Sequence, residues 1–353
     1  MRTISWRDGE LLTIDQSSLP SELRWLRLRN SSSVISAIKT MKIRGAPVIG
    51  VAAAYALALE ADHLRKGSTD QLLKRLERTA SLLKKARPTG RNLSYAVDRV
   101  IERVQRGRNL DEAKLLTIKE AQRIAGEEIT IGRRLTEKAQ TLVRDGDTIL
   151  THCNSGELAT VQYGTALGAI IRAWKRRKRF SVIATETRPL LQGARLTAWE
   201  LKRAGVPFRL ITDSMVGYVL SQKMVNKVMV GADRVWGDGT VANKIGTLTI
   251  AITANQFKVP FYVVAPISSF DFEGKPDSKI IEQRDPDEVL TIFGRRMTPR
   301  RIEALNPAFD ITPARYISAI ATEYGIIRPP FREALKQLRR NHVRERRERT
   351  KQL

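Results

Sequence analysis

The sequence predicts an α/β protein whose C-terminal part is a doubly wound, mostly parallel sheet and whose smaller N-terminal part is mainly helical. Two observations support this prediction. Five short apolar runs between Asp147 and Ala265 alternate with segments of helical periodicity. Each run is apolar at consecutive positions, as expected of a strand that helices cover on both faces. Before these runs, residues 20–137 carry leucines at helical spacing, with charged residues between them.

The N-terminal part starts with a predicted β-hairpin. Residues 3–6 and 11–14 flank Asp8-Gly9, a pair that favours a two-residue hairpin turn. The pattern is then helical, with a break at the Pro-Thr-Gly sequence of residues 88–90. The apolar, Ala-rich stretch Val48–Leu59 is shorter than the roughly 18 residues of a membrane span, which favours a buried helix. We assign residues 1–139 to this hairpin and helical domain.

The C-terminal part is predicted as a Rossmann-like domain over residues 140–330. The five predicted strands cover residues 147–152, 180–185, 208–212, 227–232 and 261–265. The predicted helices between them cover residues 158–172, 190–202, 217–223 and 245–257. Parallel strands need such crossovers, and the regular alternation therefore predicts a sheet covered by helices on both faces.

Composition excludes several classes of protein. The chain has 353 residues, 42% of them hydrophobic, so it is neither disordered nor fibrous. One cysteine cannot form a disulfide framework or a Cys-rich zinc site, and the three histidines are widely spaced. We therefore expect no metal site. The N-terminal MRTISWRDGE lacks the apolar core of a signal peptide, and these features together favour a cytoplasmic protein.

Charge is the unusual property of this sequence. Lys and Arg number 62 against 37 Asp and Glu, a net charge of +25. Nine basic residues and three acidic ones follow from Phe331 onward, and Arg172–Arg179 is a second dense basic run. Such a surface attracts phosphate groups in general. A solvated surface is the simplest interpretation, and no basic motif interleaved with aromatic residues predicts nucleic-acid binding. Residues 331–353 are treated as a basic tail.

Polar residues follow the predicted strands at the ends where a ligand is expected. In an open parallel sheet, ligands bind outside the carboxyl ends of the strands. The segments that follow the strands are residues 151–156, 186–189, 213–214 and 233–234, with Pro266 after the last strand. Because all these ends lie at one edge of a parallel sheet, the sequence predicts a site there.

Three features could hold a phosphate. Arg44-Gly45-Ala46-Pro47 precedes a predicted helix, so backbone N–H groups could face an anion beside a guanidinium. Arg87 lies next to the chain break, and Asn243-Lys244 is predicted to open the helix after the fourth strand. For each feature alone, an ordinary cap or surface charge is the alternative. The sequence lacks a Walker motif and a G-x-G-x-x-G after a strand, which disfavours nucleotide binding by those routes.

Two residues at the predicted edge could do chemistry. Cys153 lies at a strand end beside a predicted helix N-terminus, a place that lowers a thiol pKa; a small buried hydrophobe is the alternative. Asp233 follows an apolar run, which favours a retained proton; a helix cap or an ion pair with Arg234 is the alternative. Asp213 has a similar position. His152 is expected to point away from Cys153, so a Cys–His nucleophile pair does not follow.

Nine stretches, in order, resemble the methylthioribose-1-phosphate isomerase family. They are MRTISWRDGELLTIDQ, RGAPVIGVAAAYALAL, RPTGRNL, THCNSGELATVQYGTALG, ETRPLLQGARLTAWEL, ITDSMVGY, VGADRV, ANKIGT and NPAFDITPARYISAI. Together they extend from residue 1 to about 328, which leaves only the basic tail. The resemblance implies an aldose–ketose isomerase of methionine salvage that converts 5-methylthioribose 1-phosphate to 5-methylthioribulose 1-phosphate. It also implies a homodimer, no metal and no cofactor.

Carried onto this sequence, the resemblance implies a catalytic thiol at Cys153 and a catalytic acid at Asp233. It also implies a set of substrate contacts, at Arg44, Gly45, Ala46, Arg87, Gln192, Asn243 and Lys244. Two departures from the family pattern concern substrate breadth: Glu157 replaces a small apolar residue, and residues 236–238 replace a loop of smaller residues.

Two other functions remain open at this stage. A related isomerase acts on ribose 1,5-bisphosphate and would need a second phosphate site. Regulatory subunits of a translation initiation exchange factor share the fold, act through protein contacts and need no thiol and acid pair. The sequence also leaves open whether Cys153 acts as a base or stabilises charge during a hydride shift.

Overall fold

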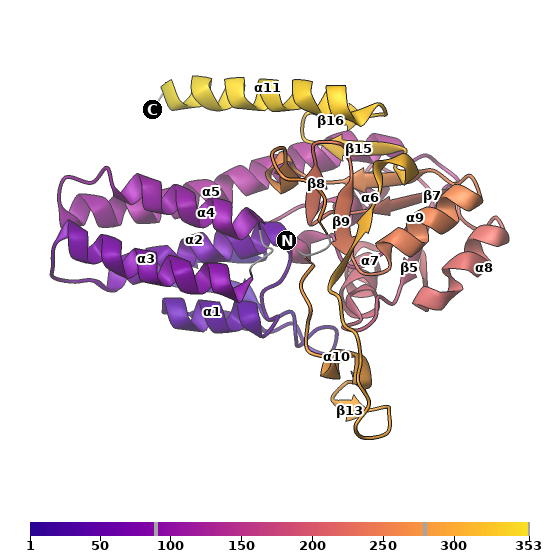
Figure 1. The fold of residues 1–353 in the computed structure, drawn as a ribbon, viewed down its shortest axis with the longest axis horizontal. Helices are drawn as coiled ribbons and strands as arrows, with labels where there is room; N and C mark the ends of the chain where they lie inside the picture. The colour runs from indigo at the N-terminus through magenta and orange to yellow at the C-terminus, as the bar shows by residue number, and fades with distance from the viewer. Residues whose placement is uncertain (88–90, 278–280, 352–353) are drawn as a thin grey trace. The chain divides into compact units, whose positions relative to one another are not determined.

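A computed structural model describes residues 1–87, 91–277 and 281–351 (Figure 1). The chain divides into two compact units. Unit 1 contains Met1–Arg133 and Ser155–Gly168, and unit 2 contains Arg134–Asn154 and Ala169–Leu353. The segment Ser155–Gly168, which directly follows the first strand of the large sheet, therefore groups with the N-terminal part of the chain. Within the described residues, no helix has both the length and the hydropathy needed to cross a bilayer.

Unit 1 starts with a three-stranded antiparallel sheet of β1 (Ile4–Arg7), β2 (Glu10–Ile14) and β3 (Trp25–Leu28), in that order. The predicted hairpin is confirmed. Asp8 and Gly9 have φ angles of 49° and 75°, and a tight turn with both central residues at positive φ matches the twist of the strands. The third strand was not predicted, because its WLRL sequence is mostly exposed and short.

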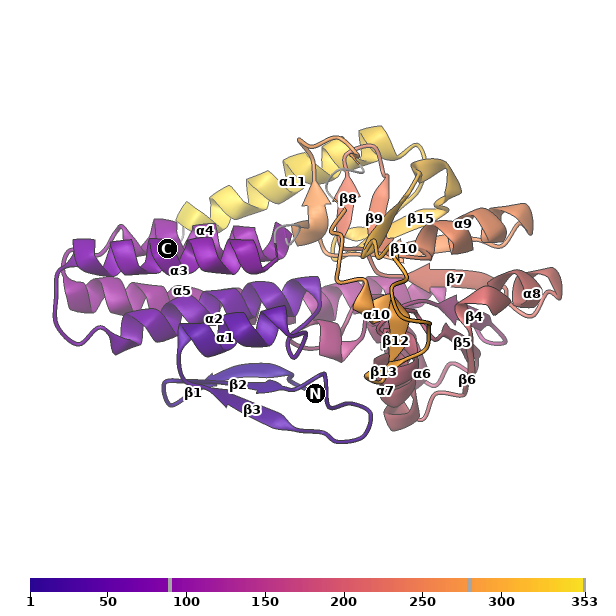
Figure 2. The ribbon, with the colours of Figure 1, turned by 60° about the horizontal axis from the view of Figure 1, so that its bottom comes forward.

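The helices of unit 1 surround one apolar helix. They are α1 (Ser31–Lys39), α2 (Ala46–His63), α3 (Thr69–Ala86), α4 (Arg91–Val104) and α5 (Leu110–Ala139). Figure 2 shows them side by side. Every residue of α2 from Pro47 to Leu59 is buried, as predicted for the Ala-rich stretch. A helix that is apolar all round belongs at the centre of a bundle, and α1, α3 and α4 all contact it.

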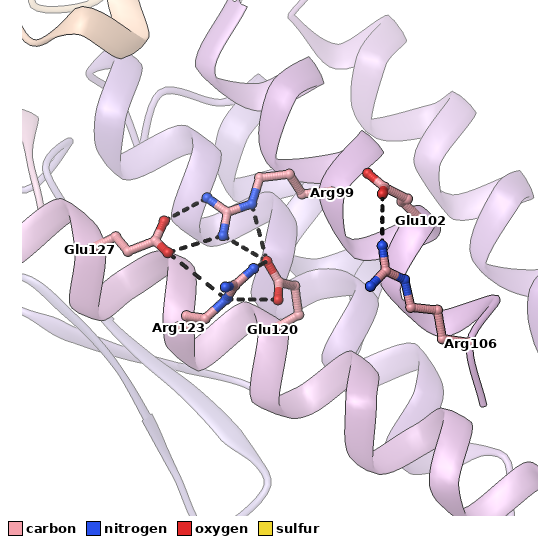
Figure 3. Close-up of polar contacts among 6 residues, drawn as sticks. All are labelled: Arg99, Glu102, Arg106, Glu120, Arg123 and Glu127. Carbon is pink, nitrogen blue, oxygen red and sulfur yellow. Dashed lines mark hydrogen bonds and ion pairs between the residues drawn. The ribbon is translucent and has the colours of Figure 1, made fainter. Parts of the chain in front are cut away.

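A network of charged side chains joins α4 to α5 (Figure 3). Arg99 of α4 binds Glu120 at 2.7 Å and Glu127 at 2.6 Å, both on α5. Arg123, also on α5, binds Glu120 at 2.9 Å. The side chain of Glu120 is only 3% exposed and that of Arg99 11%. Two cations therefore balance two anions at the interface between the two helices.

Unit 2 contains a seven-stranded sheet in the order β16-β15-β10-β7-β4-β5-β6. The strands are β4 (Thr148–Thr151), β5 (Ser181–Thr185), β6 (Phe208–Ile211), β7 (Lys227–Val230), β10 (Phe261–Val264), β15 (Ala319–Thr322) and β16 (Gly325–Ile327). All five predicted strands are present, and they pair in parallel. Only the edge strand β16 is antiparallel. The chain leaves β4 toward β5 and returns to its other side with β7, so the strand order reverses at β4.

Helices flank this sheet. They are α6 (Ala166–Lys175), α7 (Ala198–Ala204), α8 (Val216–Ser221) and α9 (Thr247–Gln256), with α11 (Phe331–Lys351) at the C-terminal end. Apolar side chains of α8, α9 and α11 pack with Leu150, Val228 and Val263 of the sheet in one core. The other face carries α6 and α7 (Figure 2). The expected doubly wound arrangement is confirmed.

A second, four-stranded sheet was not predicted. It has the order β11-β8-β9-β14, with β8 (Arg234–Trp236), β9 (Val241–Lys244), β11 (Phe270–Asp271) and β14 (Phe309–Thr312). Its presence corrects the prediction that Asn243 and Lys244 open a helix. Both residues lie in β9, and α9 begins at Thr247. Beyond it, α10 (Asp287–Leu290) precedes a small hairpin of β12 (Thr291–Ile292) and β13 (Arg295–Arg296).

Candidate active site

Cys153 follows β4, the strand at which the sheet order reverses, and this is where an open α/β sheet leaves room for a ligand. The residue is half-buried. Both backbone polar groups of Cys153 are hydrogen-bonded. The N–H donates to Thr187 Oγ1 at 2.9 Å, and the carbonyl accepts from Thr197 Oγ1 at 2.6 Å. The predicted helix N-terminus beside the thiol is wrong. A short 3-10 turn, Glu157–Ala159, comes first, and α6 starts only at Ala166.

Backbone conformations around Cys153 are unusual. Cys153 has a φ of 60°, Thr187 of 63° and Leu191 of 55°. Positive φ is rare for residues with a Cβ and rarer still for a β-branched one such as Thr187. Such strained residues persist only where the surroundings hold them, and they concentrate at functional sites. The loops after β4 and β5 therefore have the character expected of a site.

Gln192 begins a five-residue π-helical turn, Gly193–Thr197, that leads into α7. Gln192 is 3% exposed, and within the described part of the chain its Oε1 accepts no hydrogen bond. A buried amide oxygen without a donor is costly, and a ligand hydroxyl would satisfy it. The same turn supplies Thr197, which holds the Cys153 carbonyl.

Asp213 holds a loop and is not a free acid. Its carboxylate accepts the N–H of Thr187 at 2.9 Å and that of Arg188 at 2.6 Å. These bonds fix the strained turn after β5. Asp213 therefore acts as a cap, but it caps the backbone N–H groups of a loop and not those of a helix.

Asp233 lies between β7 and β8 and is half-buried. Its backbone N–H donates to the carbonyl of Ala242 at 3.0 Å, which places it beside β9. The neighbouring Arg234 guanidinium lies 3.6 Å from the carboxylate of Asp271. Asp233 thus stands at the carboxyl end of β7, the direct neighbour of β4 in the sheet.

Asn243 and Lys244 are both buried in β9. Asn243 Nδ2 donates to Thr247 Oγ1 at 3.0 Å. Lys244 Nζ donates to the Ala308 carbonyl at 2.9 Å and lies 4.9 Å from the centre of the Phe309 ring. An ammonium group that is held in position in a buried strand is a suitable partner for a phosphate or a sugar hydroxyl.

Sequence reasoning missed Asp310, which pairs with Asn243 in the sheet register. Its carboxylate accepts the N–H groups of Gly246 at 2.7 Å and Leu248 at 3.0 Å, and so caps α9. Burial raises the pKa of Asp310 from 3.8 to about 6, although the two N–H bonds act against this. Its place inside the NPAFDITP stretch was the only available signal, because the two groups that it caps lie more than 60 residues earlier.

The remaining predicted residues belong to unit 1. Gly45 is the N-cap of α2 with a φ of 104°, and Pro47 follows in the first turn, as predicted for a helix start. A Cβ on Gly45 would lie 2.3 Å from the Ala159 carbonyl oxygen, so only glycine fits. Arg44 is buried and Ala46 half-buried. Arg87 is the C-cap of α3, with Nη2 2.9 Å from Met41 Sδ; the break at 88–90 lies outside the described residues.

Unit 2 contains Cys153, Gln192, Asp233, Asn243 and Lys244, on segments that follow neighbouring strands or continue from them. Arg44, Gly45, Ala46 and Arg87 lie on the segments that border α2 and α3 in unit 1. Among the side chains that the structure describes, no group of three or more His, Cys, Asp or Glu is arranged to hold a metal ion. The groups present are a thiol, carboxylates, an amide and cations, which suit proton transfer on an anionic substrate.

Comparison with known proteins places this arrangement in a family. The model of the Initiation factor 2 subunit family matches residues 42–329. The methylthioribose-1-phosphate isomerase of Dehalococcoides mccartyi strain 195 is 47% identical over 330 residues, 93% of this chain and 98% of that protein.

Two solved structures are similar over nearly the whole chain. The 5-methylthioribose 1-phosphate isomerase of Pyrococcus horikoshii OT3 has a TM-score of 0.88 and 40% identity, covering 96% of this chain and 95% of that one. A structure described as translation initiation factor eIF-2B, subunit delta, from A. fulgidus has a TM-score of 0.84 and 42% identity, covering 95% and 99%. The chain therefore belongs to the Initiation factor 2 subunit family and, within it, to the methylthioribose-1-phosphate isomerases.

Proposed function

We propose that this chain converts 5-methylthioribose 1-phosphate to 5-methylthioribulose 1-phosphate, an aldose–ketose isomerisation in methionine salvage. The observation that supports the proposal is the position of Cys153, which is half-buried and has a strained backbone conformation where the strand order of the sheet reverses. The chain is also 47% identical to a methylthioribose-1-phosphate isomerase. By the same relationship, the substrate contacts are Arg44, Gly45, Ala46, Arg87, Gln192, Asn243 and Lys244.

The substrate imposes a particular chemistry. Its anomeric oxygen carries phosphate, so the sugar cannot open to a free aldehyde. The ring opens only when the C1–O4 bond breaks and O4 receives a proton, and we assign that proton to the carboxyl group of Asp233. Hydrogen then leaves C2 and C1 gains one, while the 2-hydroxyl gives up its proton as the ketone forms. No oxidant or reductant enters, because C2 is oxidised as C1 is reduced.

Cys153 could take part in this reaction in one of two ways. In the first, its thiolate takes the C2 proton as a base, and a proton is returned to C1. In the second, hydrogen moves from C2 to C1 as hydride, and the thiol group stabilises the charge that develops. A site shielded from water strengthens electrostatic contacts in both cases. Gln192, with its buried and unbonded Oε1, offers an acceptor for a substrate hydroxyl.

Product identification with purified protein tests the proposal. Asp233→Asn keeps the shape of the side chain but removes the acid, so turnover should fall at least about 10²-fold. Asp287→Asn, which removes an exposed carboxylate on α10, serves as the control and should leave turnover unchanged. Normal turnover by Asp233→Asn would refute the assignment of the acid.

Cys153→Ser separates a chemical role for the thiol from simple packing. A chemical role predicts a large loss of turnover, and an unchanged rate would reduce Cys153 to a packing residue. When the reaction is run in deuterium oxide, solvent deuterium at C1 of the product supports proton transfer. Its absence supports the hydride shift.

Two alternatives have their own tests. Ribose 1,5-bisphosphate, assayed beside the methylthio substrate, tests the related isomerase, which would need a second phosphate site. The A. fulgidus relative is named as a subunit of translation initiation factor eIF-2B, which favours an initiation-factor subunit as a second candidate. Lack of turnover on both sugar phosphates would support that candidate. We also propose a homodimer, which light scattering of the purified protein will test.

A further inference from the structure

Hydrogen bonds link the Cys153 loop to the segment after β9 through buried side chains of unit 2. His152 Nε2 lies 2.8 Å from the Ile245 carbonyl oxygen, and its Nδ1 lies 2.6 Å from Thr185 Oγ1. Thr185 Oγ1 is 3.2 Å from Thr187 Oγ1. Thr187 Oγ1 in turn accepts the N–H of Cys153 at 2.9 Å. The side chains of His152, Thr185 and Thr187 are at most 2% exposed.

The chemistry of the two ends sets the direction of the bonds that His152 and Cys153 make. A carbonyl oxygen only accepts, so Nε2 of His152 must carry a hydrogen toward Ile245. Burial lowers the pKa of His152, which keeps the ring neutral and leaves Nδ1 as an acceptor. Thr185 therefore donates to Nδ1, and Cys153 donates to Thr187. The single hydroxyl hydrogen of Thr187 has two acceptors within reach, Thr185 Oγ1 at 3.2 Å and the Thr185 carbonyl oxygen at 3.4 Å. With the nearer acceptor, each hydroxyl gives one bond and takes one.

Among the described residues, two charged groups act on the pKa of His152. The carboxylate of Asp213 acts to raise its pKa, while the ammonium of Lys244 acts to lower it. These influences oppose each other, and burial outweighs both. The ring also packs against the backbone of Gly246, where an added Cβ would lie 3.3 Å from Cε1 and Nε2. The contacts with Thr185, Ile245 and Gly246 therefore hold the ring of His152 in position, and the Ile245 carbonyl favours the tautomer with a hydrogen on Nε2.

We propose that His152 and Thr185 are positioning residues that set the Cys153 thiol relative to the Asn243–Lys244 segment. The N–H of Cys153 needs an acceptor, and Thr187 Oγ1 presents a lone pair to it when its own hydrogen is turned toward Thr185. His152 orders this arrangement and joins it to Ile245, the residue directly after Lys244. Neither His152 nor Thr185 needs to touch a substrate for this role.

The key variant is Thr185→Val, which replaces the hydroxyl by a methyl group of similar size. The rescue variant is Thr185→Ser, which restores the hydroxyl. The matched control is Thr151→Val: Thr151 is equally buried on neighbouring β4, and its hydroxyl binds the Met229 carbonyl at 2.9 Å, outside the chain of bonds. Both valine variants lose one buried hydroxyl from the same sheet, and comparable stability losses are expected.

Two measurements report on the Cys153 thiol, its rate of alkylation and the kcat of the isomerase reaction. The sole cysteine makes alkylation by iodoacetamide specific for Cys153, and Thr185→Val should change this rate at least about fivefold, because orientation and environment control thiol reactivity. In the isomerase assay, which rests on the proposed function, the same variant should lower kcat about tenfold or more with little change in KM. Thr185→Ser and Thr151→Val should stay near the wild type in both.

The outcomes are distinguishable. If the protein has no isomerase activity, the proposed function fails, while the alkylation rates still test the positioning role. If Thr185→Val matches Thr151→Val in alkylation rate and in kcat, the positioning role is refuted. If Thr185→Val does not fold, ¹⁵N NMR of the wild-type histidines decides: a neutral His152 ring protonated at Nε2 from pH 6 to 8 supports the proposal. Protonation at Nδ1 in that range overturns it.

Discussion

Replacing Glu120 with glutamine should cost about 3 to 5 kcal/mol of unfolding free energy, the range for removing one partner of a buried ion pair. Glu120 accepts hydrogen bonds from two nitrogens of Arg99, at 3.1 and 2.7 Å, and from two of Arg123, both at 2.9 Å. Glutamine offers one oxygen, and its NH₂ group would face a guanidinium. Arg99, only 11% exposed, would keep Glu127 as its remaining anion in the network of Figure 3.

The matched control is Glu102→Gln, in the exposed pair of Figure 3. Glu102 and Arg106 lie 3.2 Å apart, one turn apart on α4, with side chains 69% and 55% exposed. Pairs of this kind contribute about 0.3 to 0.5 kcal/mol. Urea unfolding followed by circular dichroism measures both variants against the wild type. A loss for Glu120→Gln no larger than that for Glu102→Gln would refute the reasoning that burial makes the difference.

Glu120→Gln also predicts a pH dependence. Burial alone would raise the pKa of Glu120, but the hydrogen bonds and charges of Arg123 and Arg99 bring it below its ordinary value of 4.5. The ionised carboxylate therefore stabilises the folded state above pH 4.5, and this contribution is lost as pH falls through the lowered pKa. The difference in unfolding free energy between wild type and Glu120→Gln should therefore shrink below pH 4.5.

Three further outcomes are expected. The pKa of Asp310 is raised from 3.8 to about 6, so the folded state binds this proton more tightly than the unfolded state does. The free energy of unfolding should therefore fall as pH rises from 4 to 6, by at most about 3 kcal/mol. In thermal melts, Asp310→Asn should lose this dependence of stability on pH. Gly193→Ala should lower the melting temperature sharply or prevent folding, because its Cβ would lie 1.8 Å from the Thr185 carbonyl oxygen; an unchanged melting temperature would contradict this. Lys227→Met should cost about 3 to 5 kcal/mol in urea unfolding, since it leaves buried Asp147, now 2.6 Å from Lys227 Nζ, without that cation; a loss below about 1 kcal/mol would show that the pair contributes little.

The sequence predicted those elements whose pattern is local. The parallel strands are apolar at successive positions because helices cover both faces, and the hairpin carries its turn residues at Asp8 and Gly9. The small sheet around β9 escaped prediction because its strands have two to four residues and include Asn243 and Lys244. Its order depends on pairing with β14, whose partner residues lie more than 60 positions away in the chain.

The location of the candidate site could be predicted from the sequence, but the hydrogen bonds that hold its residues in place could not. The carboxyl ends of strands can be found from the sequence, and Cys153 and Asp233 became candidates in this way. The residues that hold them could not be found: Thr187 and Thr197 bond to Cys153 across 34 and 44 residues. Threonines are common, and only the folded chain shows which of them meet the thiol loop.

The long range of these bonds has a consequence for how the protein is made. The ring of His152 finds its acceptor 93 residues further on, at Ile245. A growing chain that has emerged only as far as β7 already contains the sole cysteine but not the segment that anchors its neighbour. Contacts between such distant residues form late because a long loop must first close. The loop that carries the thiol therefore lacks its hydrogen-bonded anchor until synthesis has passed Ile245.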